Sequence, residues 1–166
     1  GIGTNAFRGC AGLTSIEIPN SVTKIGRSTF RGCTGLTAIE ISTTLSEMAR
    51  STFRGCTNLT SIELPTSLTE IGWDMFYACG NLTSIEIPDF VTFMGAHVFT
   101  GCRELTSIGS RILDFTFRKC TGLTSIRIPN SVTKIGCYAF RACSSLTSIE
   151  IPNSVTEITK NTFEGC

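Results

Sequence analysis

Hydrophobic and polar residues alternate over residues 14–18, and a second apolar and polar pattern follows over residues 22–25. In the first stretch Ile16 and Ile18 are apolar, and the residues between and before them are polar. Because successive side chains of a β-strand point to opposite sides, this alternation predicts a short strand with one buried side. Pro19 has no backbone N–H to donate to a sheet, so it ends this strand before the second short strand begins.

The segment after the second strand predicts a bend and one tight turn. Gly26 allows a bend that a side chain would resist, and residues 28–32 are long enough only for a single helical or 3₁₀ turn. We expect Phe30 and Cys33, which belong to this turn or follow it, to point back towards the interior.

The same pattern returns along the whole chain, and cysteine marks its period. Successive members of the cysteine column lie 23 residues apart, except for one interval of 18. A phenylalanine precedes each of them by three positions, and a leucine follows all but the last by three positions. The predicted repeats therefore end near Cys10, Cys33, Cys56, Cys79, Cys102, Cys120, Cys143 and Cys166, and the repeat at residues 103–120 is shortened.

A single repeat of this kind cannot bury its own apolar side. Stacked repeats bury a continuous core, with each repeat contacting only its neighbours. The strands of successive coils would then lie about 4.8 Å apart in a parallel sheet. We therefore predict that residues 1–166 form one solenoid of about seven coils rather than a globular domain.

The repeat also resembles a known family. The spacing L-x-x-I-x-I-P-x-S-V-x-x-I-G-x-x-x-F-x-x-C, seen from Leu13 to Cys33, is similar to that of BspA-like leucine-rich repeats, and the resemblance covers essentially the whole chain. It implies a right-handed leucine-rich-repeat solenoid with a parallel β-sheet on its concave face. Short strands and 3₁₀ or helical turns are expected on the other side. The resemblance also implies a cell-surface or secreted protein that adheres to host matrix proteins or to other cells, and it brings no catalytic residues.

Nine cysteines in an extracellular protein would ordinarily indicate disulfides. Equivalent side chains of stacked coils run parallel rather than facing each other, so we expect reduced, packed thiols in the cysteine column. Cys137 lies outside the column, and we expect it to be exposed and the most reactive. The chain has no C-x-x-C pair and only one histidine, so we expect neither a metal site nor a cofactor.

Two charged columns are candidate interaction surfaces. One strand position carries a candidate concave acidic column, interrupted by Gly109 and Arg127. This column is either a solvated face or a docking surface for a basic patch or a weakly bound cation. Arginines recur just before the cysteines, and we expect them on a different face. The acidic column comprises Glu17, Glu40, Glu63, Glu86 and Glu150, and the arginine column comprises Arg8, Arg31, Arg54, Arg118 and Arg141.

The repeat departs from its own pattern around the shortened coil. Residues 103–120 lack the Ile-Pro-Asn-Ser-Val segment of the other coils, so we expect the second strand there to be displaced. Aromatic residues stand at unusual positions nearby. They form either a candidate protein-recognition patch or a filling for the space that the deletion vacates. They are Trp73, Tyr77, Phe90, Phe93, His97, Phe115 and Tyr138.

Composition and motifs argue against several classes of function. The 166 residues have a net charge of +1, which offers little electrostatic energy for nucleic-acid binding. Apolar runs are far shorter than the roughly 20 residues needed to span a membrane. His97 has no recurring Ser or Asp partner, and no G-x-S-x-G, P-loop or H-E-x-x-H motif is present, so we expect no enzyme.

Two functions stay open at this stage. The first is a surface-displayed module that binds a protein partner, such as a host matrix or plasma protein or another surface protein. The second is a structural spacer in a longer repeat array without a ligand of its own. Neither end carries the polar cap of a complete solenoid, so we expect a fragment of a larger protein whose uncapped ends could associate as a homo-oligomer.

Overall fold

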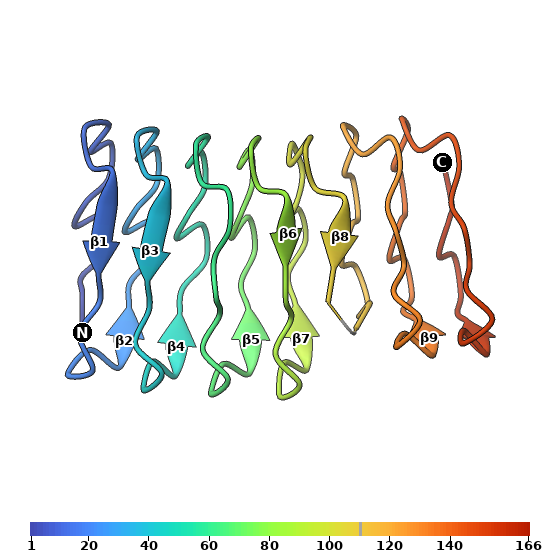
Figure 1. Ribbon diagram of the computed structural model, residues 1–166, viewed down its shortest axis with the longest axis horizontal. Helices are drawn as coiled ribbons and strands as arrows, with labels where there is room; N and C mark the ends of the chain where they lie inside the picture. Colours follow the sequence, from blue (N-terminus) through green and yellow to red (C-terminus); the bar gives the residue numbers. More distant parts are fainter. Residues whose placement is uncertain (110) are drawn as a thin grey trace.

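The computed structural model describes residues 1–109 and 111–166 and shows a rod of stacked coils (Figure 1). Its ordered backbone consists of short strands and turns, and no described residue lies in a helix. The strands are β1 (Ser15–Glu17), β2 (Lys24–Ile25), β3 (Ala38–Glu40), β4 (Glu47–Met48), β5 (Glu70–Ile71), β6 (Ser84–Ile85), β7 (Phe93–Met94), β8 (Ser107–Ile108), β9 (Lys134–Ile135) and β10 (Glu157–Ile158). The predicted solenoid of short parallel strands is therefore confirmed.

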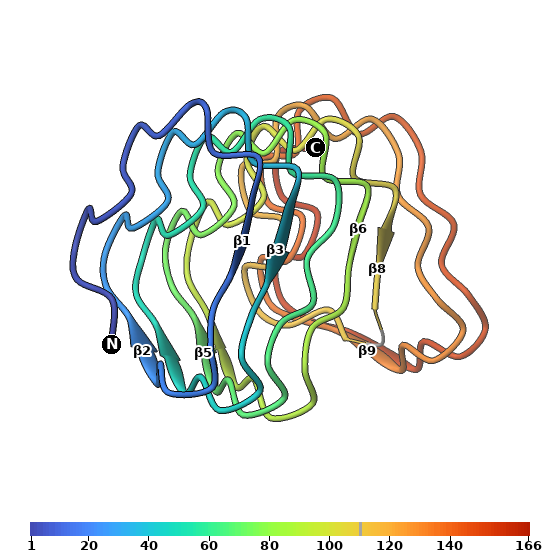
Figure 2. The ribbon, with the colours of Figure 1, turned by 60° about the vertical axis from the view of Figure 1, so that its left-hand side comes forward.

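The strands form two columns that run along the rod on different sides of the coils (Figure 2). The first column contains β1, β3, β6 and β8, and the second contains β2, β4, β5, β7, β9 and β10. Pairing is parallel and joins equivalent positions, as in Ile16 with Ile39 and Ile25 with Met48. Each coil therefore places its residues directly beside the same residues of the next coil.

A continuous stack of phenylalanine rings fills the centre of the rod. Rings of neighbouring coils have centroids 5.0–5.8 Å apart, from Phe7 to Phe163. Phe30 and Cys33 are both fully buried, as the sequence predicts. Apolar strand residues such as Ile18 and Ile25 complete the core, and stacked aromatic rings add a small stabilisation beyond their buried area.

The segment between the second strand and the cysteine forms hydrogen-bonded turns instead of a helical turn. The Arg31 N–H donates to Ser28 O at 3.1 Å, and the Cys33 N–H donates to Phe30 O at 3.1 Å. Ser28 has a φ of 55° and Gly32 a φ of 74°, and a left-handed residue interrupts a right-handed helix. The Ser28 position has a positive φ of 55–62° in eight coils, at Asn5, Ser28, Ser51, Asp74, His97, Phe115, Tyr138 and Asn161.

The cysteine column forms a ladder of thiol hydrogen bonds between coils. Cys56 Sγ donates to Phe30 O at 3.1 Å, and Cys79 Sγ donates to Phe53 O at 3.1 Å. Burial raises the pKa of the Cys56 thiol to about 12. All nine cysteines are free in the structure. Cys137 differs from the expectation: it is half-buried, and its backbone N–H donates to Asp114 Oδ1 of the preceding coil at 2.7 Å.

The shortened coil creates a discontinuity, which we call the seam: the junction between the coil that ends at Cys102 and residues 103–120. At the preceding junction, three backbone N–H groups of one coil donate to carbonyls of the next, as in Phe76 N–H to Val98 O at 3.1 Å. Within residues 1–109 and 111–166, the equivalent N–H groups of His97, Phe99 and Gly101 make no such bond. Backbone bonding on the turn side of the rod therefore stops at the seam.

Strand pairing changes at the seam as well. Ile112 pairs with Ile135 of the following coil, and none of the described pairs joins it to β7 of the preceding coil. The second strand of the short coil is thus displaced, as predicted. In the first column, at the next junction, Ser107 pairs with Arg127, 20 residues later, although the leucines that precede these two strands, Leu105 and Leu123, are 18 residues apart. A slip of two residues keeps each side chain on its original side of the sheet.

Pairing in the second column is also interrupted between β4 and β5, but that junction differs from the seam. There the turn side stays bonded, since the Ser51 N–H donates to Trp73 O at 2.9 Å and the Phe53 N–H donates to Met75 O at 3.0 Å. The described residues therefore contain one junction at which both the second column and the turn side are interrupted.

Candidate functional site

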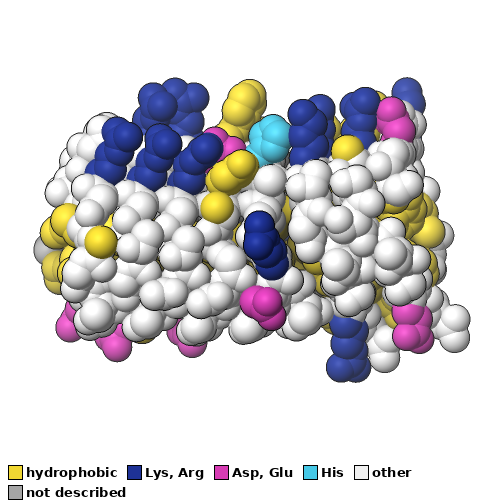
Figure 3. Space-filling view, turned by 90° about the horizontal axis from the view of Figure 1, so that it is seen from above, with side chains coloured by type: hydrophobic (Ala, Val, Ile, Leu, Met, Phe, Trp, Pro, Cys, Tyr) yellow, Lys and Arg dark blue, Asp and Glu magenta, His cyan; other side chains and the backbone are white. Residues whose placement is uncertain are grey.

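The structure separates the acidic and basic columns onto different faces. Figure 3 shows lysine and arginine side chains along one edge of the rod and acidic side chains protruding at another. The glutamates of the acidic column are exposed, and Glu17 is the direct register partner of Glu40. Within the described residues no group of three or more His, Cys, Asp or Glu side chains could hold a metal ion. The acidic column is thus a surface feature without the geometry of a metal site.

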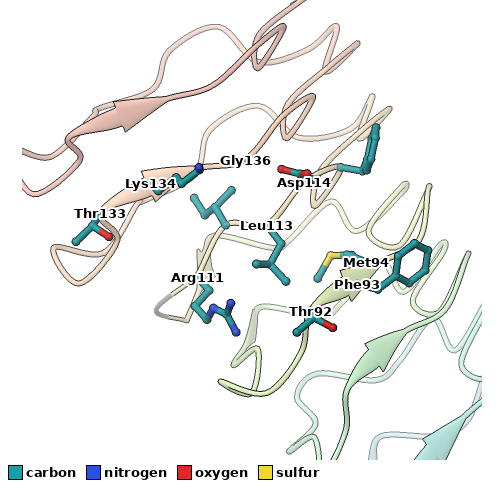
Figure 4. A pocket seen from close by; sticks show the side chains of 11 residues that line it. Thr92, Phe93, Met94, Arg111, Leu113, Asp114, Thr133, Lys134 and Gly136 are labelled. Carbon is teal, nitrogen blue, oxygen red and sulfur yellow. The ribbon is translucent and has the colours of Figure 1, made fainter.

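A groove opens on the second strand column at the seam. It has a volume of about 430 Å³ and occupies the space between β7 and the displaced second strand of the short coil (Figure 4). Met94 and Leu113 are directed into this space, and Arg111 and Lys134 lie at its rim. We call it the seam groove; it is lined by Thr92, Phe93, Met94, Arg111, Ile112, Leu113, Asp114, Phe115, Thr133, Lys134 and Gly136.

The floor of the seam groove is apolar and rigidly held. Met94 and Ile112 are each 3% exposed. Ile112 is fixed by its pairing with β9, because the Gly136 N–H donates to Ile112 O at 3.0 Å. The groove is therefore a consequence of backbone pairing: the short coil follows β9 and leaves β7 without a neighbour on that side.

Polar groups at the rim are held in fixed positions. Arg111 Nη1 donates to the carbonyl oxygens of Asp89 and Val91, the latter at 3.0 Å, and so ties the short coil to the turn before β7. Lys134 Nζ lies 2.9 Å from Glu157 Oε1, and this hydrogen bond raises the pKa of Lys134. Pockets for ligands commonly combine an apolar floor with a few placed polar groups.

Three of the candidate aromatic residues stand beside or inside the seam groove. Phe93 and Phe115 line it, and Phe93 is 45% exposed. Trp73, 56% exposed, lies against Gly95 directly after β7, where a methyl group on Gly95 would collide with Cδ1 of the indole. Large apolar surface therefore gathers on the outer side of β7.

The other candidates are placed differently. Tyr138 stacks on Phe115, with centroids 5.4 Å apart, and extends the aromatic surface beyond the seam. His97 is half-buried in the same column. Tyr77 lies under the guanidinium of Arg54 at 4.1 Å, and Phe90, 69% exposed, lies in the turn before β7. Neither Tyr77 nor Phe90 lines the groove.

Sequence reasoning missed the polar and aliphatic residues of the groove. Arg111, Asp114 and Lys134 were not singled out, because each stands at a position where charged residues recur in other coils. The available signal was the deletion itself, which falls directly after Gly109 and exposes the side of β7 that a full-length coil would cover.

Comparison with known proteins decides the family. The model described as "BspA type Leucine rich repeat region (6 copies)" matches residues 1–106 and 110–166. The chain belongs to the BspA-type leucine-rich repeat family. That description counts six copies, so our number of about seven coils stays a prediction. Leucine-rich repeat modules generally mediate protein interactions, and the family is generally non-enzymatic.

Two solved leucine-rich repeat structures are similar to this BspA-type chain. The crystal structure of a T. pallidum leucine-rich repeat protein has 34% sequence identity and a TM-score of 0.75, and the match covers 89% of this chain and 71% of that chain. A leucine-rich repeat protein from Eubacterium ventriosum has 19% identity and a TM-score of 0.58, covering 99% of this chain and 49% of that one. The second likeness shows the fold alone.

No curated protein sequence matches this chain. Among the described residues of this BspA-type repeat, no helix is long and apolar enough to cross a membrane.

Proposed function

We propose that this chain is a non-enzymatic protein-binding module of a cell-surface or secreted protein. It mediates adhesion to a protein of the host or of a neighbouring cell. The observation that carries the proposal is the aromatic surface of Trp73 and Phe93 beside the seam groove, at the one described junction where both the second column and the turn side are interrupted. Membership of the BspA-type family supports the surface location.

The chemistry of the seam suits protein recognition. Trp and Tyr side chains supply large contact areas at low entropic cost and dominate many interfaces. The seam groove adds an apolar floor into which a partner side chain fits, and Arg111 and Lys134 at its rim favour an acidic or carbonyl-rich neighbour on that partner.

Backbone conformation gives a second line of support. Phe115 has a φ of 62° and Tyr138 a φ of 56°, a region in which bulky residues are uncommon. Asparagine, aspartate and serine occupy this position in five other coils, where their short polar side chains accept it more readily. Strained residues tend to gather at functional sites, so aromatic residues here favour a role in binding over a role in packing.

The test is binding of the purified chain to immobilised extracellular-matrix and plasma proteins, measured at two salt concentrations. We expect saturable binding that the variant Trp73→Ala/Phe93→Ala/Tyr138→Ala loses while its circular dichroism and melting temperature stay close to those of the original. Ile158→Ala is the matched control, because Ile158 is 49% exposed but lies in β10, away from the seam. If neither protein binds and both are folded, the spacer function replaces this proposal.

A further inference from the structure

Opposite charges at equivalent positions of neighbouring coils form ion pairs in this protein. Lys24 Nζ lies 2.7 Å from Glu47 Oε1, and Lys134 Nζ lies 2.9 Å from Glu157 Oε1. Arg141 Nη2 similarly lies 3.1 Å from Glu164 Oε1. Stacking thus brings equivalent side chains within reach of each other. Where equivalent positions carry charges of the same sign, side chains of neighbouring coils repel each other and form no ion pair.

Arginines of the same sign stack in two adjacent rows on the coils that end at Cys10, Cys33 and Cys56. We call them the arginine rows: Arg8, Arg31 and Arg54, and beside them Arg27 and Arg50. Arg54 pairs with Asp74 at 2.9 Å. Within residues 1–109 and 111–166, the other four make no ion pair and no side-chain hydrogen bond. Figure 3 shows basic side chains crowded along this edge of the rod.

Glutamates of the same sign stack on the first strand column of the same part of the rod. We call Glu17, Glu40 and Glu63 the glutamate row. All three are exposed, and in the described part of the chain none forms an ion pair. Like charges directly opposite each other in a sheet are destabilising, and Glu17 and Glu40 are direct partners. Like charges therefore repel each other within the arginine rows and within the glutamate row, and an oppositely charged surface would relieve this repulsion.

The arginine rows and the glutamate row have the same spacing, because each of them follows the coils. Each row gains one residue per coil, and the stacked rings of these coils advance by 5.3–5.7 Å. An extended acidic peptide presents side chains on one side at intervals of roughly 6.6–6.8 Å, which falls out of step over a few residues. The glutamate row of another copy stays in step with the arginine rows over their whole length.

We propose that the arginine rows of one copy bind the glutamate row of a second copy, with the two rods lying side by side. The two surfaces differ, so the contact is heterologous, and a pair of copies keeps one glutamate row unused on the first copy and the arginine rows unused on the second. Such a contact continues from copy to copy until it closes into a ring or extends as a filament. This association is independent of partner binding at the seam, which lies on later coils.

The interaction depends strongly on salt. A single exposed ion pair contributes little to binding, so the rows act only together. Screening acts over about 30 Å at 0.01 M salt but over about 8 Å at 0.15 M. We therefore expect association at low ionic strength that weakens by roughly tenfold or more when salt is raised to physiological strength.

The experiment uses neutral replacements, so that no new complementary surface is created. The arginine variant is Arg8→Gln/Arg27→Gln/Arg50→Gln, and the glutamate variant is Glu17→Gln/Glu40→Gln/Glu63→Gln; all six side chains are exposed. The matched control is Arg103→Gln/Lys119→Gln/Lys160→Gln, which removes the same positive charge from exposed positions outside the rows. Sedimentation velocity over a concentration series at low and high salt reports the size, and circular dichroism confirms the fold.

The expected result has three parts. The original chain and the control associate at low salt, each row variant alone is monomeric, and an equimolar mixture of the two variants forms a 1:1 complex that grows no further. A monomeric original chain overturns the proposal, and so does association that survives in both row variants, which would indicate contacts through the ends of the rod. Retention of the original chain on immobilised heparin, without self-association, would assign the arginine rows to a polyanion instead.

Discussion

The phenyl rings of Phe99 and Phe117 have centroids 5.7 Å apart but are tilted by 35° against each other, whereas Phe53 and Phe76 stack with a tilt of 4°. The tilted pair faces across the seam. The core therefore continues through the junction, but the rings cannot keep the alignment that backbone bonds impose elsewhere. On the turn side, side-chain packing and the hydroxyl of Thr100, which donates to Lys119 O at 3.0 Å, join the two parts of the rod in place of the backbone ladder.

Restoring the missing segment should close the seam groove. Insertion of Ile-Pro-Asn-Ser-Val after Gly109 returns the short coil to the length of its neighbours. The added Ile and Val would bury apolar surface beside β7, at about 1.5–3 kcal/mol for each side chain before ordering costs. We expect a higher melting temperature, at about 2–4 °C for each kcal/mol, measured by calorimetry.

The same insertion should weaken partner binding, because the groove is filled. An insertion of Gly-Ser-Gly-Ser-Gly at the same site is the control, since it adds length without apolar side chains. An unchanged melting temperature with the Ile-Pro-Asn-Ser-Val insertion would contradict our account of how the groove arises.

Phenylalanines of the core and of the surface should differ sharply in their contribution to stability. Phe76 is fully buried between Phe53 and Phe99, so Phe76→Ala should lower the free energy of unfolding by about 3–5 kcal/mol. Phe93 is 45% exposed, and Phe93→Ala should cost less than about 1 kcal/mol. Urea denaturation measures both. Equal losses would mean that Phe93 is a packing residue.

Phe115→Asn tests whether the aromatic residue at a left-handed position serves binding. The substitution loses the stacking on Tyr138, worth about 0.5–1.5 kcal/mol, and relieves a backbone strain of similar size. We expect a change in unfolding free energy within about 1 kcal/mol together with clearly weaker partner binding. Ser51→Asn, at the same position of a regular coil, should leave binding unchanged.

The buried thiols should make the fold sensitive to alkaline pH. Burial raises the pKa of Cys56 and of Cys102 to about 12. In the unfolded chain these thiols ionise near their ordinary value of about 8.5. Above that pH the unfolded state binds fewer protons than the folded state, so stability falls as pH rises from about 8.5 towards 12.

Each such thiol contributes a slope of up to about 1.4 kcal/mol per pH unit in that range. Urea denaturation at pH 8 and pH 10 measures it. Cys56→Ala/Cys102→Ala should lose part of the slope, whereas Cys10→Ala, at an exposed position, should keep it. A full slope in the double variant would assign the effect to other groups.

The regular part of this fold follows from the sequence because each position repeats. The phenylalanine and cysteine columns identify the core, and Pro19 and its equivalents mark the ends of the first strands. The left-handed turn was less evident, although Asn5, Asp74 and Asn161 in one column were a signal for it. A column of residues that tolerate positive φ indicates a turn that no helix can include.

The seam groove could not be predicted in the same way. The sequence shows that residues 103–120 are short, but not which neighbour the displaced strand follows. That choice depends on the balance between pairing Ile112 with Ile135 and pairing it with Met94, and a repeat pattern carries no information about a single exception. The role of Arg111, which reaches the turn before β7, follows only once this choice is made.

The missing backbone bonds at the seam also determine how the rod responds to mechanical force. A pull along its axis passes through every junction in series, so each junction bears the same load. Three turn-side N–H groups resist at the junction before the seam, whereas those of His97, Phe99 and Gly101 contribute nothing across it. We therefore expect the turn side of the rod to open first between Phe99 and Phe117, whereas in the first column β8 stays paired with β6 across the seam.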